Sequence, residues 1–200
     1  MPPRPSERKT DTRERILRAA RELLRSAGPE GLSLREVARS VGIAAPSIYE
    51  HFDGKDALVE ALTLDTRSRL RHALERSVEA APEEALLAIG LAYVRFALSD
   101  PDGFRLLFLQ RGSGRASLEQ AVPEASPYSV VLRAVSDAAL ARRVRARSTT
   151  EVEHIAYGLW ALAHGIAVLR LTHLAGMQAD FEAADRAAFV AYLAGLHHGS

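Results

Sequence analysis

The stretch from Leu34 to Phe52 constrains the fold of this chain more than any other feature. Its first apolar residues recur at helical spacing and end at Gly42: Leu34, Val37, Ala38 and Val41. Ile48 and Phe52 then lie about one helical turn apart, and Pro46 before them suits the first turn of a helix. Two short helices joined by so tight a turn predict a helix-turn-helix.

The rest of the chain carries the same helical periodicity and shows no alternation typical of strands. Further helices are predicted over 11–27, 55–80, 83–99, 102–110, 127–145, 149–172 and 181–196. The expected fold is all-α. It consists of a flexible arm at 1–10, an N-terminal three-helix helix-turn-helix domain at 11–54, and a C-terminal helical domain at 55–200.

Two Ser-x-x-Glu patterns predict where helices begin. Ser33 with Glu36, and Ser148 with Glu151, are capping boxes in which each side chain satisfies a backbone N–H at the start of the helix. These patterns place the starts of the 34–41 and 149–172 helices.

Composition limits the classes of function. A chain of 200 residues that is 48% hydrophobic and 26% charged can bury a core. The absence of cysteine excludes disulfides, thiolate metal sites and thiol catalysis. The formal net charge is only +1, but residues 1–55 hold 11 Lys/Arg against 8 Asp/Glu. Positive charge is therefore concentrated in the helix-turn-helix part, as expected of a segment that meets phosphates.

Motifs for other chemistry are missing. There is no Gly-rich phosphate loop, HExxH or G-x-S-x-G, so neither an enzyme nor a cofactor is predicted. Gaps of ten and nine residues between His154, His164 and His173 place no two of them on one helix face, which argues against a metal site. The N-terminus lacks a signal-peptide core, and no apolar run approaches about 18 residues, so a cytoplasmic location without a membrane span is expected.

The run "GLSLREVARSVGIAAPSIYEHFDGKDALVEAL" resembles the DNA-binding domain of the tetracycline-repressor (TetR) family of bacterial regulators, and the similarity covers about residues 12–62. The shared pattern is Gly-hydrophobic, small residues, hydrophobic-Tyr-x-His-Phe and x-x-Lys-x-x-Leu. The resemblance implies phosphate contacts from Ser33, Tyr49, His51 and Lys55. It implies that Ala45, Ser47 and Glu50 face base edges in the major groove of double-stranded DNA.

The sequence departs from the family pattern at Ala44, where many members have Ser or Thr. The third helix, predicted over about 45–52, therefore lacks its usual side-chain cap. The loss of such a cap costs about 1 kcal/mol locally.

The second half resembles a TetR-family subgroup with a Trp-His-Gly signature in its regulatory domain, here Trp160, His164 and Gly165. Trp160 and His164 are four residues apart and share a helix face, so both can point into a ligand cavity or into a subunit interface. By family analogy the helices that carry Phe104 and Phe108 surround the effector cavity. The predicted ligand-binding residues are Phe104, Phe108, Trp160 and His164.

The helices at 149–172 and 181–196 hold more small and apolar residues than one buried face needs. They predict a homodimer whose interface includes Ala156, Gly158, Ala161, Gly165, Val168 and Leu193. A two-fold axis would then place two recognition helices about one DNA turn apart.

These features predict a ligand-responsive, sequence-specific transcriptional regulator. The expected form is a repressor that a small, largely apolar effector releases from a palindromic operator. Two other classes are alternatives: a helical enzyme or ligand carrier that kept the helix-turn-helix as a scaffold, and an architectural DNA binder without an effector. Catalytic motifs are missing for the first, and the second has no use for the helices after the DNA-binding segment.

Overall fold

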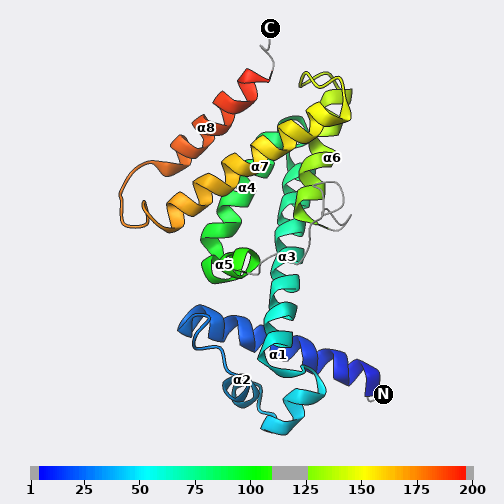
Figure 1. Cartoon of the computed structure of the whole chain (residues 1–200), viewed down its shortest axis with the longest axis vertical. Coiled ribbons are helices and arrows are strands. Elements are labelled where there is room, and N and C mark those ends of the chain that lie inside the picture. Colours follow the sequence, from blue (N-terminus) through cyan, green and yellow to red (C-terminus); the bar gives the residue numbers. More distant parts are fainter. Residues whose placement is uncertain (1–4, 110–125, 197–200) are drawn as a thin grey trace. The chain divides into compact units, whose positions relative to one another are not determined.

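The computed structural model describes residues 5–109 and 126–196, with side chains placed over 11–108 and 126–196. All secondary structure over these residues is helical (Figure 1), which confirms the predicted all-α fold. The chain divides into two compact units. The first contains the described residues up to Thr66 together with 100–109, and the second contains 67–99 and 126–196.

The helices follow the predicted order closely. Those of the first unit are α1 (Pro5–Ala27), α2 (Leu34–Val41), the 3₁₀ helix η1 (Ala45–Glu50) and α5 (Pro101–Leu109). Those of the second unit are the 3₁₀ helix η2 (Pro82–Glu84), α4 (Ala85–Ser99), α6 (Pro127–Leu140), α7 (Thr149–Leu171) and α8 (Phe181–Gly195). The helix α3 (Gly54–Ala80) belongs to the first unit up to Thr66 and to the second unit from Arg67.

One apolar core holds the first unit together. The side chains in it come from α1, α2, η1, the first part of α3 and α5, and they include Ile16, Leu24, Val37, Ile48, Phe52, Leu58, Leu62 and Leu106. The Arg13 guanidinium lies 4.9 Å from the centre of the Phe52 ring, and Arg21 forms an ion pair of 2.6 Å with Asp65. The compact unit therefore extends past the predicted boundary at residue 54, because α3 and α5 bury apolar side chains in the same core.

The turn after α2 has the geometry that its glycine predicts. The helix ends at Val41, and Gly42 has φ 75°, a left-handed conformation that side chains disfavour. The Ile43 N–H donates to the Ala38 carbonyl at 3.0 Å, which closes the helix end. The link from α2 to η1 is therefore short and specified by Gly42.

At two places the helix boundaries differ from the prediction. Residues 5–10 were expected in the arm but are helical, and Pro5 suits a helix start because its φ is preset and it lacks the N–H that would go unsatisfied there. Residues 1–4 of the arm lie outside the described residues. The helix α6 ends at Leu140 instead of 145, because Arg142 adopts φ 57° and the chain turns to bury Val144.

The second unit is a bundle of helices in which α4 packs against α7 and α8. The Phe189 ring of α8 is fully buried against Gly90 of α4, where no side chain would fit. In α8, Tyr192 donates from its hydroxyl to the Ile155 carbonyl at 2.9 Å, and Asp185 accepts from Arg170 at 2.7 Å. These contacts fix α8 beside α4 and α7 (Figure 1).

The helix α7 is long and apolar, although the sequence analysis expected no membrane span. Its mean hydropathy reaches 1.3 over an 18-residue window, and only 22% of that window is buried. By length and composition alone this helix could cross a membrane, so the expectation was too strict. The core helix of a soluble protein passes the same test, so one such helix is weak evidence for a membrane span.

Candidate nucleic-acid interface and regulatory site

The helix η1 turns outward the side chains that the sequence predicts to meet DNA. Ile48 and Phe52 are 0% and 3% exposed and anchor the segment in the core. The remaining side chains therefore face solvent: Ala45, Tyr49 and Glu50 are exposed, and Ser47 and His51 are partly exposed. The Tyr49 ring is 59% exposed, which leaves its hydroxyl accessible to a partner.

The recognition segment is a short 3₁₀ helix where an α-helix over 45–52 was predicted. Ala44 occupies the N-cap position and makes no side-chain hydrogen bond, because an alanine side chain has no acceptor. The Ser47 N–H instead donates to the Ala44 carbonyl at 2.9 Å. This tighter bonding satisfies a backbone donor that an uncapped α-helix would leave open, so the missing cap explains the local geometry.

Ser33 occupies the predicted N-cap position of α2 but does not form the predicted capping box. Its hydroxyl makes no capping hydrogen bond, and Glu36 pairs with Arg39 one turn further along. The start of α2 is therefore as predicted, but the side chains of Ser33 and Glu36 do not make the predicted capping hydrogen bonds. The Ser33 hydroxyl is left partly exposed at the amino end of the helix.

Lys55 is exposed in the first turn of α3, directly after a sharp turn. Gly54 has φ 91° and donates from its N–H to the Phe52 carbonyl at 2.9 Å. Only residues 51–53 separate η1 from this 27-residue helix. An ammonium and the amino end of a long helix together suit a phosphate oxygen.

The Nδ1 atom of His51 is buried and has no hydrogen-bond partner. Orphaned N–H donors are rarer in folded proteins than unsatisfied acceptors, so the proton is better placed on Nε2. In that tautomer the donor of His51 is the nitrogen on the other side of the ring from the buried Nδ1.

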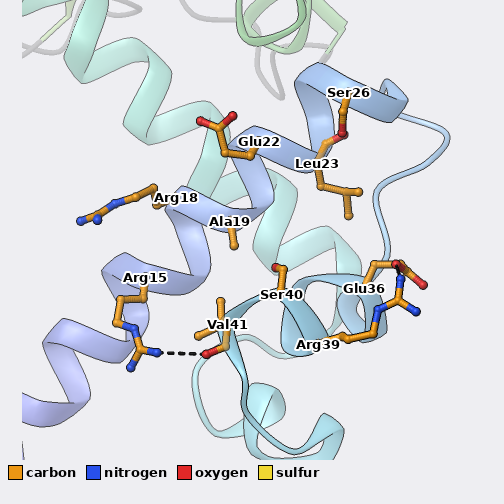
Figure 2. Close-up of a pocket in the computed structure, with 10 residues that line it drawn as sticks. All are labelled: Arg15, Arg18, Ala19, Glu22, Leu23, Ser26, Glu36, Arg39, Ser40 and Val41. Atoms are coloured by element: carbon orange, nitrogen blue, oxygen red, sulfur yellow. Dashed lines mark hydrogen bonds and ion pairs between the residues drawn. The ribbon is translucent and has the colours of Figure 1, made fainter.

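A groove of about 670 Å³ lies between α1 and α2 (Figure 2). Arg15 donates across it to the Val41 carbonyl at 2.9 Å, and Arg39 pairs with Glu36 at its edge. Arg18 and Glu22 also line it. The groove is lined by three arginines and two glutamates, so the net charge of its lining is slightly positive.

In the second unit, Trp160 and His164 belong to an aromatic cluster that joins α4, α6 and α7. The Trp160 ring meets the edges of two tyrosines, with ring centres 4.8 Å from Tyr93 and 5.6 Å from Tyr128. The Tyr93 hydroxyl lies 3.0 Å from Nδ1 of His164. Both residues of the signature therefore contact α4 of the same chain, and Tyr128 is a member of the cluster that the sequence analysis missed.

Burial sets the protonation of this pair. It raises the pKa of the Tyr93 hydroxyl and lowers the pKa of His164. Both groups are therefore neutral near pH 7, and the Tyr93 O–H can donate to Nδ1 of His164.

The lowered pKa predicts a stability change with pH. Below the ordinary histidine pKa of about 6.5, the unfolded chain binds a proton at residue 164 more readily than the folded chain. Stability should therefore fall as pH drops from about 6.5 toward the folded-state pKa. The measurement is urea unfolding at several pH values in wild type and His164→Gln, and the variant should lose part of this slope. Equal slopes in the two proteins would show that His164 does not contribute.

The four predicted ligand-binding residues are divided between the two units. Phe104 is buried and belongs to the first unit, and Phe108 lies beside it with ring centres 4.8 Å apart. Trp160 and His164 belong to the second unit. That these four residues bind an effector stays a prediction.

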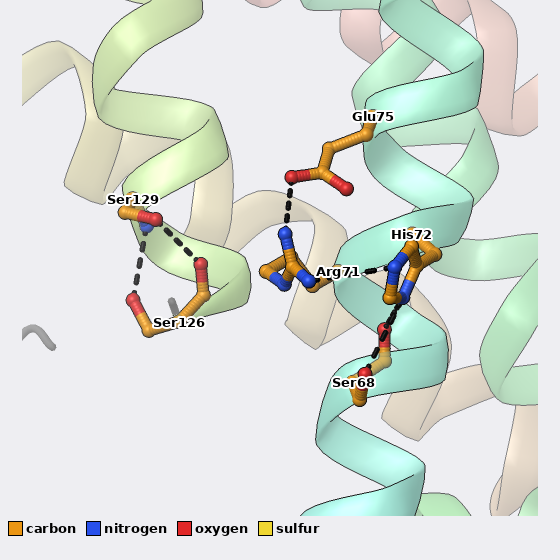
Figure 3. A network of polar contacts seen from close by, with 6 residues as sticks. All are labelled: Ser68, Arg71, His72, Glu75, Ser126 and Ser129. Carbon is orange, nitrogen blue, oxygen red and sulfur yellow. Dashed lines mark hydrogen bonds and ion pairs between the residues drawn. The ribbon is translucent and has the colours of Figure 1, made fainter. Parts of the chain in front are cut away.

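A polar network on α3 was also missed (Figure 3). Arg71 extends toward the start of α6 and donates to Glu75 at 2.6 Å, and Nδ1 of His72 lies 2.7 Å from the Ser68 carbonyl. Ser126 caps α6 by accepting from the Ser129 N–H at 3.1 Å. The i to i+4 spacing of Arg71 and Glu75 was the available signal, but it does not show that Arg71 is only partly exposed.

Comparison with known proteins identifies the family. The pattern described as "Bacterial regulatory proteins, tetR family" matches residues 16–62, the segment that holds most of α1 with α2, η1 and the start of α3. The pattern described as "Tetracyclin repressor-like, C-terminal domain" matches residues 86–192, more than half of the chain. This chain belongs to the TetR family. TetR-family proteins are DNA-binding transcriptional regulators and not enzymes, so the interpretation as a helical enzyme is excluded.

The chain is also similar to individual known proteins. A protein of unknown function from Rhodococcus sp. RHA1 is 30% identical with a TM-score of 0.79, and the match covers 94% of this chain and 96% of that one. The class D tetracycline repressor of Escherichia coli is 28% identical over 149 residues, 73% of this chain. The match spans only 63% of that repressor. A TetR variant from Acinetobacter baumannii AYE, in complex with minocycline, is 19% identical with a TM-score of 0.58 over 90% of this chain and 93% of that one, and shows the fold alone.

Proposed function

We propose that this protein is a repressor that binds a palindromic operator in double-stranded DNA and is released by a small, largely apolar effector. The observation that carries the proposal is η1, in which two buried anchors hold an exposed tyrosine and small or polar side chains toward solvent. The name of the Escherichia coli relative supports the sign of regulation. We also propose a cytoplasmic location, because a bacterial regulator meets DNA there, and membership of the Trp-His-Gly subgroup, because Trp160, His164 and Gly165 carry its motif.

In this proposal the exposed side chains divide into two roles. Ser33, Tyr49, His51 and Lys55 donate to phosphates and set the position on the duplex. Ala45, Ser47 and Glu50 face base edges and set the sequence preference, with Glu50 accepting from a cytosine amino group. The partial exposure of Ser33 and His51 is consistent with the phosphate role.

Replacing Lys55 with alanine tests the phosphate role. Lys55→Ala should weaken binding to all duplexes and reduce the slope of log K against log salt by about one, because one phosphate contact is lost. The measurement is fluorescence anisotropy on an operator found by selection from random duplexes, across a salt series. Arg133→Ala is the matched control, because Arg133 is an exposed cation on α6. An unchanged slope in Lys55→Ala would remove the residue from the interface.

We also propose that the protein is a homodimer joined through α7 and α8. Tyr157, Ala161 and Val168 are exposed and recur along one face of α7, and nothing lies within 4 Å of the position where a side chain would begin at Gly165. This apolar stripe accounts for the low burial of α7. Two residues expected at the interface lie inside the protomer instead: Ala156 is fully buried, and Gly158 lies under the Tyr192 hydroxyl.

The effector is proposed to act on the second unit beside the aromatic cluster. Because α3 runs without a break from Lys55 into the second unit, a ligand that favours one position of its later part also biases its first turn. A coupling of about 1–3 kcal/mol would change operator affinity 5- to 150-fold. Trp160 and His164 are the candidate contacts, with His164 supplying the polar one.

The test begins with a thermal-shift screen for a ligand. Operator affinity is then measured with and without that ligand in wild type and in His164→Ala. The ligand should lower operator affinity in wild type, and His164→Ala should bind it less tightly. A ligand that binds without any change in operator affinity would contradict regulation, and an unchanged ligand affinity in the variant would exclude His164.

A further inference from the structure

A groove in the second unit does not belong to the aromatic cluster. It has a volume of about 450 Å³ and is lined by residues from the end of α3, η2, α4, α6, the turn after α6, and α8, but by none from α7. Its apolar walls include Val78, Leu86, Leu87, Val144, Val190 and Leu193. The volume lies in the range of small-molecule sites, and walls of this kind favour an apolar body.

The rim of the groove carries more negative than positive groups. Its charged residues are Glu83, Glu84, Asp137, Arg143 and Arg186. Arg143 pairs with Glu83 at 3.0 Å and also donates to the Pro82 carbonyl at 3.0 Å. Arg186 lies 3.6 Å from Glu84. Each guanidinium on the rim is therefore already matched to one glutamate.

Asp137 is the one acidic residue on the rim that pairs with neither Arg143 nor Arg186. It lies on the last turn of α6, which ends at Leu140, and its side chain is exposed. The carbonyl groups at the end of a helix carry partial negative charge, so they add to the field of the Asp137 carboxylate. An anionic ligand would face three carboxylates against two guanidinium groups, whereas a cation meets the carboxylate of Asp137, which pairs with neither arginine.

We propose that this groove binds an amphiphilic organic monocation, a protonated amine on an aryl or alkyl body. The ammonium group pairs with Asp137, and the apolar body covers the walls between α4 and α8. This site is separate from the proposed effector contacts at Trp160 and His164. Because the binding requires no DNA, the inference stands or falls independently of the proposed operator.

The first experiment compares three probes with one apolar body and different head groups. These are 4-phenylbutylammonium, 4-phenylbutan-1-ol and 4-phenylbutanoate, titrated calorimetrically into the full-length protein at pH 7. The amine should bind about fivefold more tightly than the alcohol, the gain expected of one exposed ion pair, and the carboxylate should bind most weakly. Equal affinities, or tighter binding of the carboxylate, would overturn the proposal.

Two variants then locate the site. Asp137→Asn should remove the advantage of the amine over the alcohol, whereas Glu182→Gln should keep it, because Glu182 is an exposed carboxylate on α8 that does not line the groove. Val190→Phe should weaken all three probes by filling the groove, and it should fold because Val190 is 47% exposed. If Asp137→Asn changes nothing, or Val190→Phe alters sedimentation but not probe affinity, the groove does not hold the cation.

Discussion

Phe189→Ala is expected to lower the free energy of unfolding by about 3–5 kcal/mol. The Phe189 side chain is fully buried, and its ring fills the space over Gly90 where α8 meets α4. Removing it leaves a cavity that the two backbones cannot close, because other contacts of α8, such as the Arg170–Asp185 ion pair, hold the helix in place. Urea unfolding at fixed protein concentration measures the change, since a dimer makes stability depend on concentration.

The reciprocal variant tests the same contact. A methyl group at position 90 would begin 2.5 Å from Cε1 of Phe189, so Gly90→Ala should cost about 1–3 kcal/mol through overpacking. In the Phe189→Ala background the added methyl enters the cavity, and the cost should vanish or change sign. A double-mutant cycle therefore should show strong coupling. Additive effects would mean that α4 and α8 do not pack closely at this point. Gly176→Ala is the control for the glycine change, because a side chain there meets nothing within 4 Å.

Ala161→Glu is expected to convert the protein to a monomer and to lower operator affinity by about 100-fold or more. Ala161 lies in the middle of the exposed apolar stripe on α7, so the glutamate of each protomer would face an apolar surface across the two-fold axis. A monomer holds one half-site only and loses the gain in effective concentration that the second half-site provides. Analytical ultracentrifugation and anisotropy on the same operator measure the two effects.

Thr150→Glu is the matched control for this substitution. It introduces the same charge on the same helix, at an exposed position in the first turn where a carboxylate is favourable. The control should stay dimeric and bind the operator with little change. If Ala161→Glu also sediments as a dimer, the stripe on α7 is not the interface, and its apolar face must serve another partner.

Signals carried by neighbouring residues were reliable guides to the fold. The bounds of α2 and the left-handed Gly42 follow from a short apolar stripe and a glycine, and the start of α7 follows from Ser148, which accepts from the Glu151 N–H at 3.2 Å. Helix bounds failed where no local signal existed. The early end of α6 depends on the burial of Val144. This burial is a long-range effect, and the sequence around Arg142 contains no signal for it.

At the candidate DNA interface, too, local spacing predicted part of the structure and long-range packing decided the rest. Residue spacing alone separated the inward Ile48 and Phe52 from the outward Tyr49 and Glu50, because a helical repeat fixes which residues share a face. Spacing did not reveal that η1 is a 3₁₀ helix or that Nδ1 of His51 is buried. Both depend on how the segment sits against its core.

By itself the sequence determined the all-α class, the order of the helices, the helix-turn-helix and the resemblance that led to the TetR family, because each of these rests on short-range periodicity, caps and turns. The tertiary structure alone decided the long-range pairings. It joined Leu106 to the first core, Tyr93 to His164, and Phe189 to Gly90, and it assembled the groove around Asp137. Such pairings depend on which apolar faces meet in three dimensions. The apolar faces of different helices show the same spacing in the sequence. Only the packed fold therefore shows which two faces are in contact.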